Sequence, residues 1–370
     1  MKTLITFVLL LILSFLENPI FANSSLKVDF KTGDPGISSI NSMTFGPEGI
    51  LFIGDSKSAQ IVAIDLSTHP KVDNSAVKID FLDKLIADML GSAIDQIQIT
   101  DMAVNPENDN IYLSVHHSSG NVVLFRVEHN TLKKVSLDNI SHSKTSLIDP
   151  VNKEAKDKRG RKLRKWAVAD IKYTSGKVLL SGLSNKEFAS TFRSVDFPFT
   201  DKQDYGSLEI YHAAHGQYET HAPIKAFIPT KIKGSSHIIA GYTCTPLVIF
   251  PMNNIKPGEH NKGRTIAELG SGNSPVDMVE IKNGGQRYLL IANNNRPLMK
   301  MEFTDLESYN GSLTTPVVKK GAAEGVSYVN LPYVNVQQLD KFGGTGFLIV
   351  QRESSGNLTL KKGNSWWLEK

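Results

Sequence analysis

Cysteine is almost absent from this chain of 370 residues, in which Cys244 is the only thiol. A single thiol cannot form an internal disulfide, so the fold must be held together by its core. The C-x-x-C-H pattern of covalently attached haem does not occur, and neither does G-x-S-x-G, H-E-x-x-H or a phosphate-binding glycine loop. These absences remove the commonest serine hydrolase, metalloprotease and nucleotide-binding classes. We therefore expect no covalent haem and no nucleotide cofactor.

Charge of one sign and long apolar runs are also scarce. The formal net charge of +4 gives no overall field that would attract nucleic acid. The one long apolar run, Leu4–Leu16, follows Met1 and Lys2 and ends before small residues near Ala22. This pattern predicts a secretory signal peptide over residues 1–22, with an uncleaved membrane anchor as the alternative. We expect a periplasmic or extracellular protein with no membrane span after signal removal.

The chain does contain a repeated pattern of short apolar segments, which is clearest in Met43–Leu66 (MTFGPEGILFIGDSKSAQIVAIDL). Apolar residues alternate with polar ones in three segments, and Gly, Pro and Asp residues separate the segments. This period-two pattern is typical of short antiparallel strands joined by tight turns. Similar stretches begin at Asp101, Asp170 and Asp277, and two divergent copies begin at Ser235 and Asn335.

Repeats of roughly 40–70 residues with about four strands each predict a β-propeller. We expect one all-β domain over residues 23–370, built from six four-stranded blades, with seven blades as the alternative. The last copy supplies only three strands before the C-terminus. The segment Leu26–Phe30 is therefore expected to complete that blade and to close the ring.

The order of elements in Met43–Leu66 resembles that of the NHL-type and gluconolactonase-like propellers. It runs from an apolar strand through a Gly-Pro-x-Gly turn to a second strand, Asp-Ser and a third strand. The resemblance covers nearly the whole mature chain as a blade pattern and implies the propeller fold, which hosts many activities. Gluconolactonase-like propellers hold one central ion with Asp, Asn and Glu residues. This chain has no glutamate at an obvious matching first-blade position.

Two segments depart from the strand pattern. In Phe81–Ile94, apolar residues recur at three- and four-residue steps, which predicts a short helix that either covers the propeller or packs on a blade end. In Lys153–Lys165 (KEAKDKRGRKLRK), eight residues are basic and two are acidic. This basic loop is either a solvated connection or a docking site for an acidic partner or anionic surface. Trp166 is the only aromatic residue beside it, which argues against nucleic-acid binding.

The repeat also predicts which residues share a face, because the first strand of each propeller blade lines the central channel. The loop before that strand and the turn after the second strand open on one face, which we call the channel-mouth face. Alignment of the copies places six residues at the mouth: Ser42, Asp101, Asp170, Ala226, Asp277 and Asn335.

Three aspartates around one narrow mouth repel one another unless they are protonated, hydrated or neutralised. Oxygen ligands of this kind suit a hard divalent cation, and calcium is the favoured ion. The alternative is that each aspartate caps the turn before its strand. The predicted metal ligands are Asp101, Asp170 and Asp277, assisted by Asn293, Asn335 or Asp55.

Further candidates lie on the same face. His116 is expected beside Asp101, where it could act as a general base near a metal-bound water. His212, His215 and His221 could bind zinc or copper, although surface histidines are the alternative. Cys244 lies on a turn with no cation nearby, so burial is expected. The residues predicted to bind a ligand are Asn293, Arg296, Tyr242 and His215.

Three functions follow from these features. The first is an exported binding protein that docks a small ligand or an extracytoplasmic protein through the channel-mouth face. The second is a metal-dependent hydrolase, lactonase or lyase that uses the channel aspartates and His116. The third is a subunit of a periplasmic redox system, in which the basic loop meets an acidic electron carrier.

Overall fold

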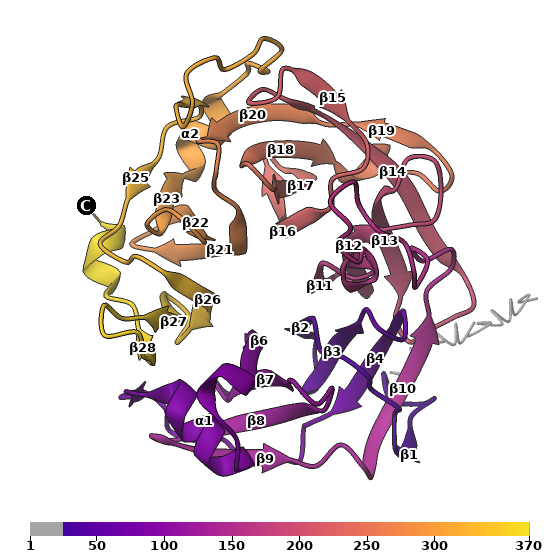
Figure 1. Ribbon diagram of the computed structural model, residues 1–370, viewed down its shortest axis with the longest axis vertical. Helices are drawn as coiled ribbons and strands as arrows, with labels where there is room; N and C mark the ends of the chain where they lie inside the picture. Colours follow the sequence, from indigo (N-terminus) through magenta and orange to yellow (C-terminus); the bar gives the residue numbers. More distant parts are fainter. Residues whose placement is uncertain (1–24, 370) are drawn as a thin grey trace, which may run out of the picture.

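The computed structural model describes residues 25–369, in which six antiparallel sheets stand around a central axis like the blades of a propeller (Figure 1). The predicted six-bladed all-β fold is therefore confirmed. The predicted signal peptide, residues 1–22, lies outside the described residues. The first strands of the blades face the axis, and they are β2 (Ser42–Phe45), β6 (Ile97–Val104), β11 (Asp170–Thr174), β16 (Ile224–Ile232), β21 (Pro275–Asn283) and β26 (Val336–Phe342).

The middle strands of each blade are short apolar runs that are largely buried, because each sheet packs against a neighbouring sheet on both faces. The second strands are β3 (Ile50–Asp55), β7 (Ile111–His117), β12 (Lys177–Leu183), β17 (Ser235–Tyr242), β22 (Gln286–Asn293) and β27 (Gly346–Arg352). The third strands are β4 (Gln60–Asp65), β8 (Val122–Glu128), β13 (Ser190–Asp196), β18 (Pro246–Pro251), β23 (Met299–Glu302) and β28 (Leu358–Lys362).

The outer strands are less regular than the inner ones. In the same blade order, the fourth strands are β10 (Ile140–Ser146), β9 (Thr131–Val135), β14 (Gln203–His212), β20 (Arg264–Leu269), β25 (Val329–Asn330) and β5 (Lys78–Ile79). Four short strands extend these edges: β1 (Lys31–Gly33) on β10, β15 (Gln217–Glu219) and β19 (His260–Lys262) on β14, and β24 (Ala323–Gly325) on β20.

The order of the blades around the ring differs from their order along the chain. Figure 1 shows β6, which belongs to the second blade of the chain, between β2 and β26. The chain leaves the first blade after β4, and β5 then pairs with β28 of the last blade. After the β6–β9 blade the chain returns as β10, which pairs with β4. The ring is thus closed by β5 and β10. These strands precede and follow the β6–β9 blade in the sequence, but each belongs to one of the two blades beside it.

This closure differs from the predicted one. Leu26–Phe30 contains a turn rather than a strand, and the nearby β1 pairs with β10 at the outer edge of the first blade. The strand that completes the last blade is β5, whose Ile79 is in register with Leu360. β5 has only two residues, too few to produce a periodic pattern in the sequence.

Six hydrophobic clusters fill the interfaces between neighbouring blades. Helix α1 (Leu82–Leu90) lies within the predicted range 81–94 and buries Leu82 and Ile86 in the cluster between the β6 and β26 blades. Across residues 25–369, no helix has the length and apolar character needed to cross a membrane. The other helical turns are α2 (Phe303–Ser308), η1 (Ile94–Gln96), η2 (Arg164–Trp166), η3 (Met252–Asn254) and η4 (Ser365–Leu368).

Candidate functional site

The register of the first strands decides which residues meet at the channel mouth. Asp277 pairs with Ala292 after a bulge, and Gln338 pairs with Val350 after the same kind of bulge. Gln338 therefore occupies the position in the last blade where Asn335 was predicted, and Asn335 precedes β26, is exposed and has a positive φ. The paired residues are 15 positions apart in Asp277–Ala292 and 12 apart in Gln338–Val350, so the last hairpin is three residues shorter and the alignment of the copies missed this difference. The residues at this level are Ser42, Asp101, Asp170, Ala226, Asp277 and Gln338.

Four aspartates of the channel connect neighbouring blades. In Asp277, Oδ1 accepts the N–H of Met278 at 2.8 Å, and Oδ2 accepts the N–H of Leu339 on β26 at 3.1 Å. Each of the others likewise accepts the N–H of the next residue and one N–H from the adjoining blade. The remaining sets are Asp101 with Met102 and Met43, Asp170 with Ile171 and Phe227, and Asp340 with Lys341 and Val104.

Lys172 places a cation among these carboxylates. It follows Asp170 by two residues on β11, so both side chains face the channel. The ammonium nitrogen of Lys172 lies 3.1 Å from Asp170 Oδ1. Burial alone would lower the pKa of Lys172, but the surrounding aspartates raise it above its ordinary value. Lys172 also lines a cavity of about 390 Å³ at the far end of the channel, together with Asp101, Asp277 and Asp340.

The channel carboxylates titrate unusually because the channel is enclosed and acidic. Burial, with the charges of Asp170 and Asp340, raises the pKa of Asp277 to about 7, although Lys172 opposes the shift. Burial and the charge of Asp277 also raise the pKa of Asp101, and burial raises that of Asp340. Protonation and Lys172 together relieve the repulsion that the sequence predicted. These contacts favour a structural role, and the central calcium site stays a prediction.

Asp55, another predicted metal ligand, is fully buried in the first blade. Its carboxylate accepts the Ser38 N–H at 2.9 Å, the Ser39 hydroxyl at 2.7 Å and the Ser58 N–H at 3.1 Å. The Gln60 amide donates a fourth hydrogen bond at 3.1 Å. Asp55 thus joins the loop before β2 to the turn after β3.

His116 does not lie beside Asp101 as predicted. The strand register pairs His116 with Gln98 and Asp101 with Ser114, so His116 lies two residues along β7 from the partner of Asp101. The Nε2 atom of His116 accepts the N–H of Ile40 at 2.9 Å. Burial lowers the pKa of His116, and the lone pair that a general base needs is already engaged.

The predicted ligand-binding residues divide into two groups. Asn293 and Tyr242 are buried, and Tyr242 belongs to the cluster between the third and fourth blades. Arg296 is half-buried and His215 is exposed, so only these two remain accessible from solvent. Cys244 is half-buried, contrary to the predicted burial, and has a positive φ on the turn after β17.

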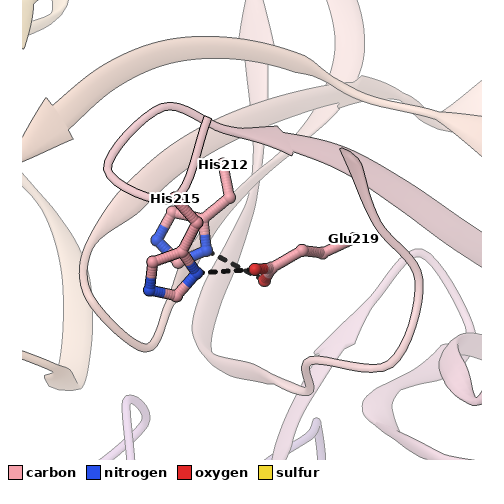
Figure 2. A group of neighbouring side chains, drawn as sticks. All are labelled: His212, His215 and Glu219. Atoms are coloured by element: carbon pink, nitrogen blue, oxygen red, sulfur yellow. Dashed lines mark hydrogen bonds and ion pairs between the residues drawn. The ribbon is translucent and has the colours of Figure 1, made fainter. Parts of the chain in front are cut away.

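A cluster of His212, His215 and Glu219 lies at the connection between β14 and β15 (Figure 2). The Nδ1 atoms of His212 and His215 lie 2.9 Å and 2.6 Å from the two carboxylate oxygens of Glu219. The two imidazole rings lie one over the other, with their centroids 3.8 Å apart. Sequence reasoning chose His221 as the third member, but its ring contacts Thr220 instead.

The His–Glu cluster is fixed to the body of the protein. The buried carboxylate of Glu268 accepts the N–H of Ala214 at 3.1 Å, and the carbonyl of Ala213 accepts the N–H of Val317 at 3.0 Å. Burial would raise the pKa of Glu219, but hydrogen bonds from the two histidines lower it to about 2. Burial raises the pKa of Glu268 to about 7, and the nearby charge of Glu219 contributes a smaller increase.

The basic loop Lys153–Lys165 forms an ordered hairpin on the channel-mouth face. Leu163 N–H donates to the carbonyl of Ala155 at 2.9 Å, and the backbones of Lys156 and Lys162 form an isolated antiparallel β-bridge. The Asp157 carboxylate closes the tip by accepting the backbone N–H groups of Arg159 and Arg161, each at 2.9 Å.

The base of the basic loop is held against two turns of the same face. The Arg164 guanidinium donates to the carbonyls of Val151 and Lys57, at 2.6 Å and 3.4 Å. Gly182 allows the loop to approach β12, since a Cβ there would lie 2.3 Å from the Ala167 carbonyl oxygen. The loop is therefore supported from both sides.

Comparisons with known proteins add no activity. No protein-family model and no curated protein matches the chain. Solved structures similar to it include Raptor of Chaetomium thermophilum, at 12% identity and a TM-score of 0.33, with 90% of this chain and 26% of that chain covered. They also include the WD40 propeller domain of Doa1, at 8% identity and a TM-score of 0.31, with 89% and 94% covered. A protein of Thermus thermophilus described as an oxidoreductase (glucose dehydrogenase) has 9% identity and a TM-score of 0.32, with 90% and 99% covered.

This chain thus spans about a quarter of the Raptor chain. Similarity at this level carries no argument about function. Membership of the NHL-type or gluconolactonase-like families stays a prediction.

Proposed function

We propose that the protein is a binding module that docks an acidic protein partner on its channel-mouth face through the basic loop Lys153–Lys165. The observation that carries this proposal is the excess of unneutralised positive charge on an ordered loop. Eight of the thirteen residues are basic. Within residues 25–369, the only ion pair formed by the side chains of this loop joins Arg161 to Asp157.

The exposed cations are positioned to act together. Lys156, Lys158, Arg159, Lys162 and Lys165 all have exposed side chains on or beside the hairpin. A hairpin already ordered by Asp157 loses little conformational entropy when a partner binds. Several cations on one rigid loop attract an acidic surface and orient it before contact.

Neighbouring residues extend the positive patch toward the channel mouth. The ammonium group of Lys165 lies 5.1 Å from the ring centroid of Trp166. The amine of Lys225 lies 3.1 Å from the same ring, but burial and the charge of Lys165 lower its pKa to about 7, so Lys225 adds less positive charge to the patch. Lys57 is exposed on the adjoining turn. A single indole among several cations suits a protein surface better than a nucleic-acid strand, which needs successive stacking platforms.

A fluorescence anisotropy titration with a labelled poly-glutamate peptide tests the proposal. We expect saturable binding that weakens as salt is added, because exposed charges are screened. The combined substitutions Lys158→Glu, Arg159→Glu and Lys162→Glu should weaken binding by about tenfold or more, since each lost surface pair costs about 0.5 to 1 kcal/mol.

The matched control reverses three exposed lysines on the opposite face, with Lys71→Glu, Lys233→Glu and Lys282→Glu. This control changes the net charge equally and should retain more affinity than the loop variant. Equal losses in the two triple variants would show a non-specific charge effect and contradict docking through the loop. Tighter binding of a single-stranded DNA with equal charge would favour a nucleic-acid partner instead.

A metal-dependent hydrolase is the second function that the sequence predicted. It has less support, because Nε2 of His116 is occupied by the Ile40 N–H. Export remains part of the proposal, since the signal peptide predicted over residues 1–22 would deliver the protein to the periplasm or the exterior. Cell fractionation of the tagged full chain tests it, and a purely cytoplasmic location would contradict it.

A further inference from the structure

We propose that the β14–β15 connection binds one zinc ion through His212 Nδ1, His215 Nδ1 and the Glu219 carboxylate. This site is separate from the basic loop and does not depend on the function proposed above. Two imidazoles and one carboxylate form a ligand set that zinc uses in proteins, with the fourth position left for water or another ligand. Calcium is disfavoured, because it prefers six to eight oxygen ligands.

The strand geometry explains why these three residues converge. In the β14–β15 pair, Ile210 is in register with Glu219 and His212 with Gln217. His212 therefore shares a face with Glu219, since side chains two residues apart on a strand point the same way. The turn that follows then places the His215 ring over the His212 ring, as Figure 2 shows.

The donor atoms are close to the spacing that zinc needs. Each of the three residues offers a donor atom within 4.8 Å of the other two. The two nitrogen–oxygen distances are 2.9 Å and 2.6 Å. In a tetrahedral site with bonds of about 2.0 to 2.2 Å, neighbouring donors lie roughly 3.3 to 3.6 Å apart. Small rotations, chiefly of the exposed His215 side chain, would open the carboxylate–imidazole contacts enough to admit the ion.

The surroundings restrict which atoms can coordinate. His212 is 1% exposed, and its Nε2 is buried with no hydrogen-bond partner among the described residues. Nδ1 is the nitrogen that faces the Glu219 carboxylate, at 2.9 Å, and is therefore the ligand atom of His212. His215 is accessible from solvent, which provides a path for the ion.

A buried carboxylate anchors the segment that carries the two histidines. Glu268 on β20 is fully buried and accepts the N–H of Ala214, which lies between the two histidines in sequence. The backbone between the two ligand histidines is therefore held against β20.

The ligand residues are also preorganised. Thr265 Oγ1 donates to the carbonyl of Tyr211 at 2.7 Å, and Tyr211 packs edge-on against Tyr218 with 5.2 Å between ring centroids. Both ends of the connection are thus fixed before an ion arrives. A preformed set of donors loses less entropy on binding than a mobile loop would.

Isothermal titration calorimetry with zinc chloride, on the folded and metal-stripped protein, tests the proposal. We expect one equivalent to bind. His215→Ala and Glu219→Gln should each weaken zinc binding by at least about tenfold, because each removes one of three ligands. His221→Ala is the matched control, since its ring lies in the same segment but outside the cluster, and it should bind zinc within about twofold of the wild type.

Cobalt substitution provides an independent readout. Cobalt bound at this site should show the visible absorption of a low-coordinate nitrogen and oxygen complex, and His215→Ala should abolish it. His215 is preferred to the buried His212 for this test, because its exposed side chain can be removed without disturbing the core. The proposal is wrong if the wild type binds no zinc, or if His215→Ala and Glu219→Gln bind it as tightly as His221→Ala does.

Discussion

The channel and the basic loop are both rich in charge, but the channel charges have partners within the protein and most of the loop charges lack an ion-pair partner among the described residues. In the channel, four aspartates each accept two backbone N–H groups, and Lys172 stands among them. In the basic loop, eight cations face two acidic residues, and only Arg161 has an ion-pair partner among the described side chains. The channel charges are satisfied within the protein, whereas the loop charges are left for something outside it.

The difference separates residues that hold the ring from residues available for binding. Carboxylates that connect adjoining first strands hold neighbouring blades together. The boundary between two blades is where a propeller ring would open most easily. In five of the six neighbouring pairs of first strands, a side chain of one strand accepts a backbone N–H of the other, and Ser42 Oγ does so for Ile171. Ala226 cannot accept one, and β16 and β21 are joined instead by apolar packing and by the Thr230 hydroxyl, which donates to the Glu280 carboxylate at 2.7 Å.

The largest effect should come from breaking a channel connection. Asp170→Ala removes the acceptor for Ser42 Oγ, the N–H of Phe227 and the ammonium group of Lys172. Buried donors without partners cost free energy, so the free energy of unfolding should fall by about 3 to 5 kcal/mol. Urea denaturation measures this change. The exposed Asp201→Ala is the control and should change stability by less than about 0.5 kcal/mol.

A loss below about 1 kcal/mol in Asp170→Ala would mean that the connections are dispensable. The claim that the channel aspartates hold the ring together would then be wrong.

Lys172→Met removes the channel cation and should have the next largest effect. We expect a loss of about 1 to 3 kcal/mol at pH 8, reduced because the side chain is partly exposed. The loss should shrink as the pH falls, since Asp277, whose pKa is raised to about 7 mainly by burial, can then become neutral. Denaturation at several pH values measures this.

Adding calcium tests whether Lys172 takes the place of a metal ion in the channel. If Lys172 takes the place of a metal, calcium should stabilise Lys172→Met more than the wild type, because only the variant has uncompensated carboxylates. Strong calcium stabilisation of the wild type, lost in Asp170→Ala, would instead support the central ion that the sequence predicted.

The sequence identified much of the channel and little of its chemistry. The aligned copies placed Asp101, Asp170 and Asp277 together because strand periodicity fixes which side chains share a face. Lys172 was missed although it lies two residues after Asp170, and period two alone would have placed it in the channel. Asp340 was missed because the hairpin that follows Gln338 is three residues shorter than the one that follows Asp277, which shifts the alignment of the first strand.

Glu268→Gln should change how stability depends on pH. Burial raises the pKa of Glu268 in the folded protein to about 7, above its ordinary value of 4.5. The folded state therefore holds a proton that the unfolded state has released, and this group makes the protein less stable as the pH rises through that range. The variant should remove a loss on the order of 2 to 3 kcal/mol between pH 5 and pH 8.

Thermal denaturation of both proteins at the two pH values measures the difference. Glu280→Gln is the control, because Arg287 and Thr230 lower the pKa of Glu280 against the opposing effect of burial. A pH profile that Glu268→Gln leaves unchanged would show that Glu268 stays ionised in the folded protein.

The smallest effect should be confined to the basic loop. Asp157→Ala removes the acceptor at the hairpin tip, which is exposed to solvent, so global stability should change by less than about 0.5 kcal/mol. Hydrogen exchange of the Arg159 and Arg161 amides should accelerate, because both donate to this carboxylate. Unchanged exchange at these amides would show that other contacts order the loop.

The binding candidates on loops were harder to predict than the blades. His212 and His215 stood out because the segment Tyr211–His221 is rich in histidine and aromatic residues, but Glu219 joins them only through the register of β14 and β15. The basic loop was evident from its composition. Its ordered hairpin was not, because the order depends on the Asp157 carboxylate and on contacts with distant turns.

The most direct test of this account measures poly-glutamate affinity for two variants side by side, at a temperature where both are folded. Lys172→Met should bind the peptide like the wild type while unfolding more easily. The triple loop variant Lys158→Glu, Arg159→Glu and Lys162→Glu should keep wild-type stability and lose about tenfold or more in affinity. Loss of affinity in folded Lys172→Met, with full affinity in the loop variant, would contradict the account and place binding in the channel.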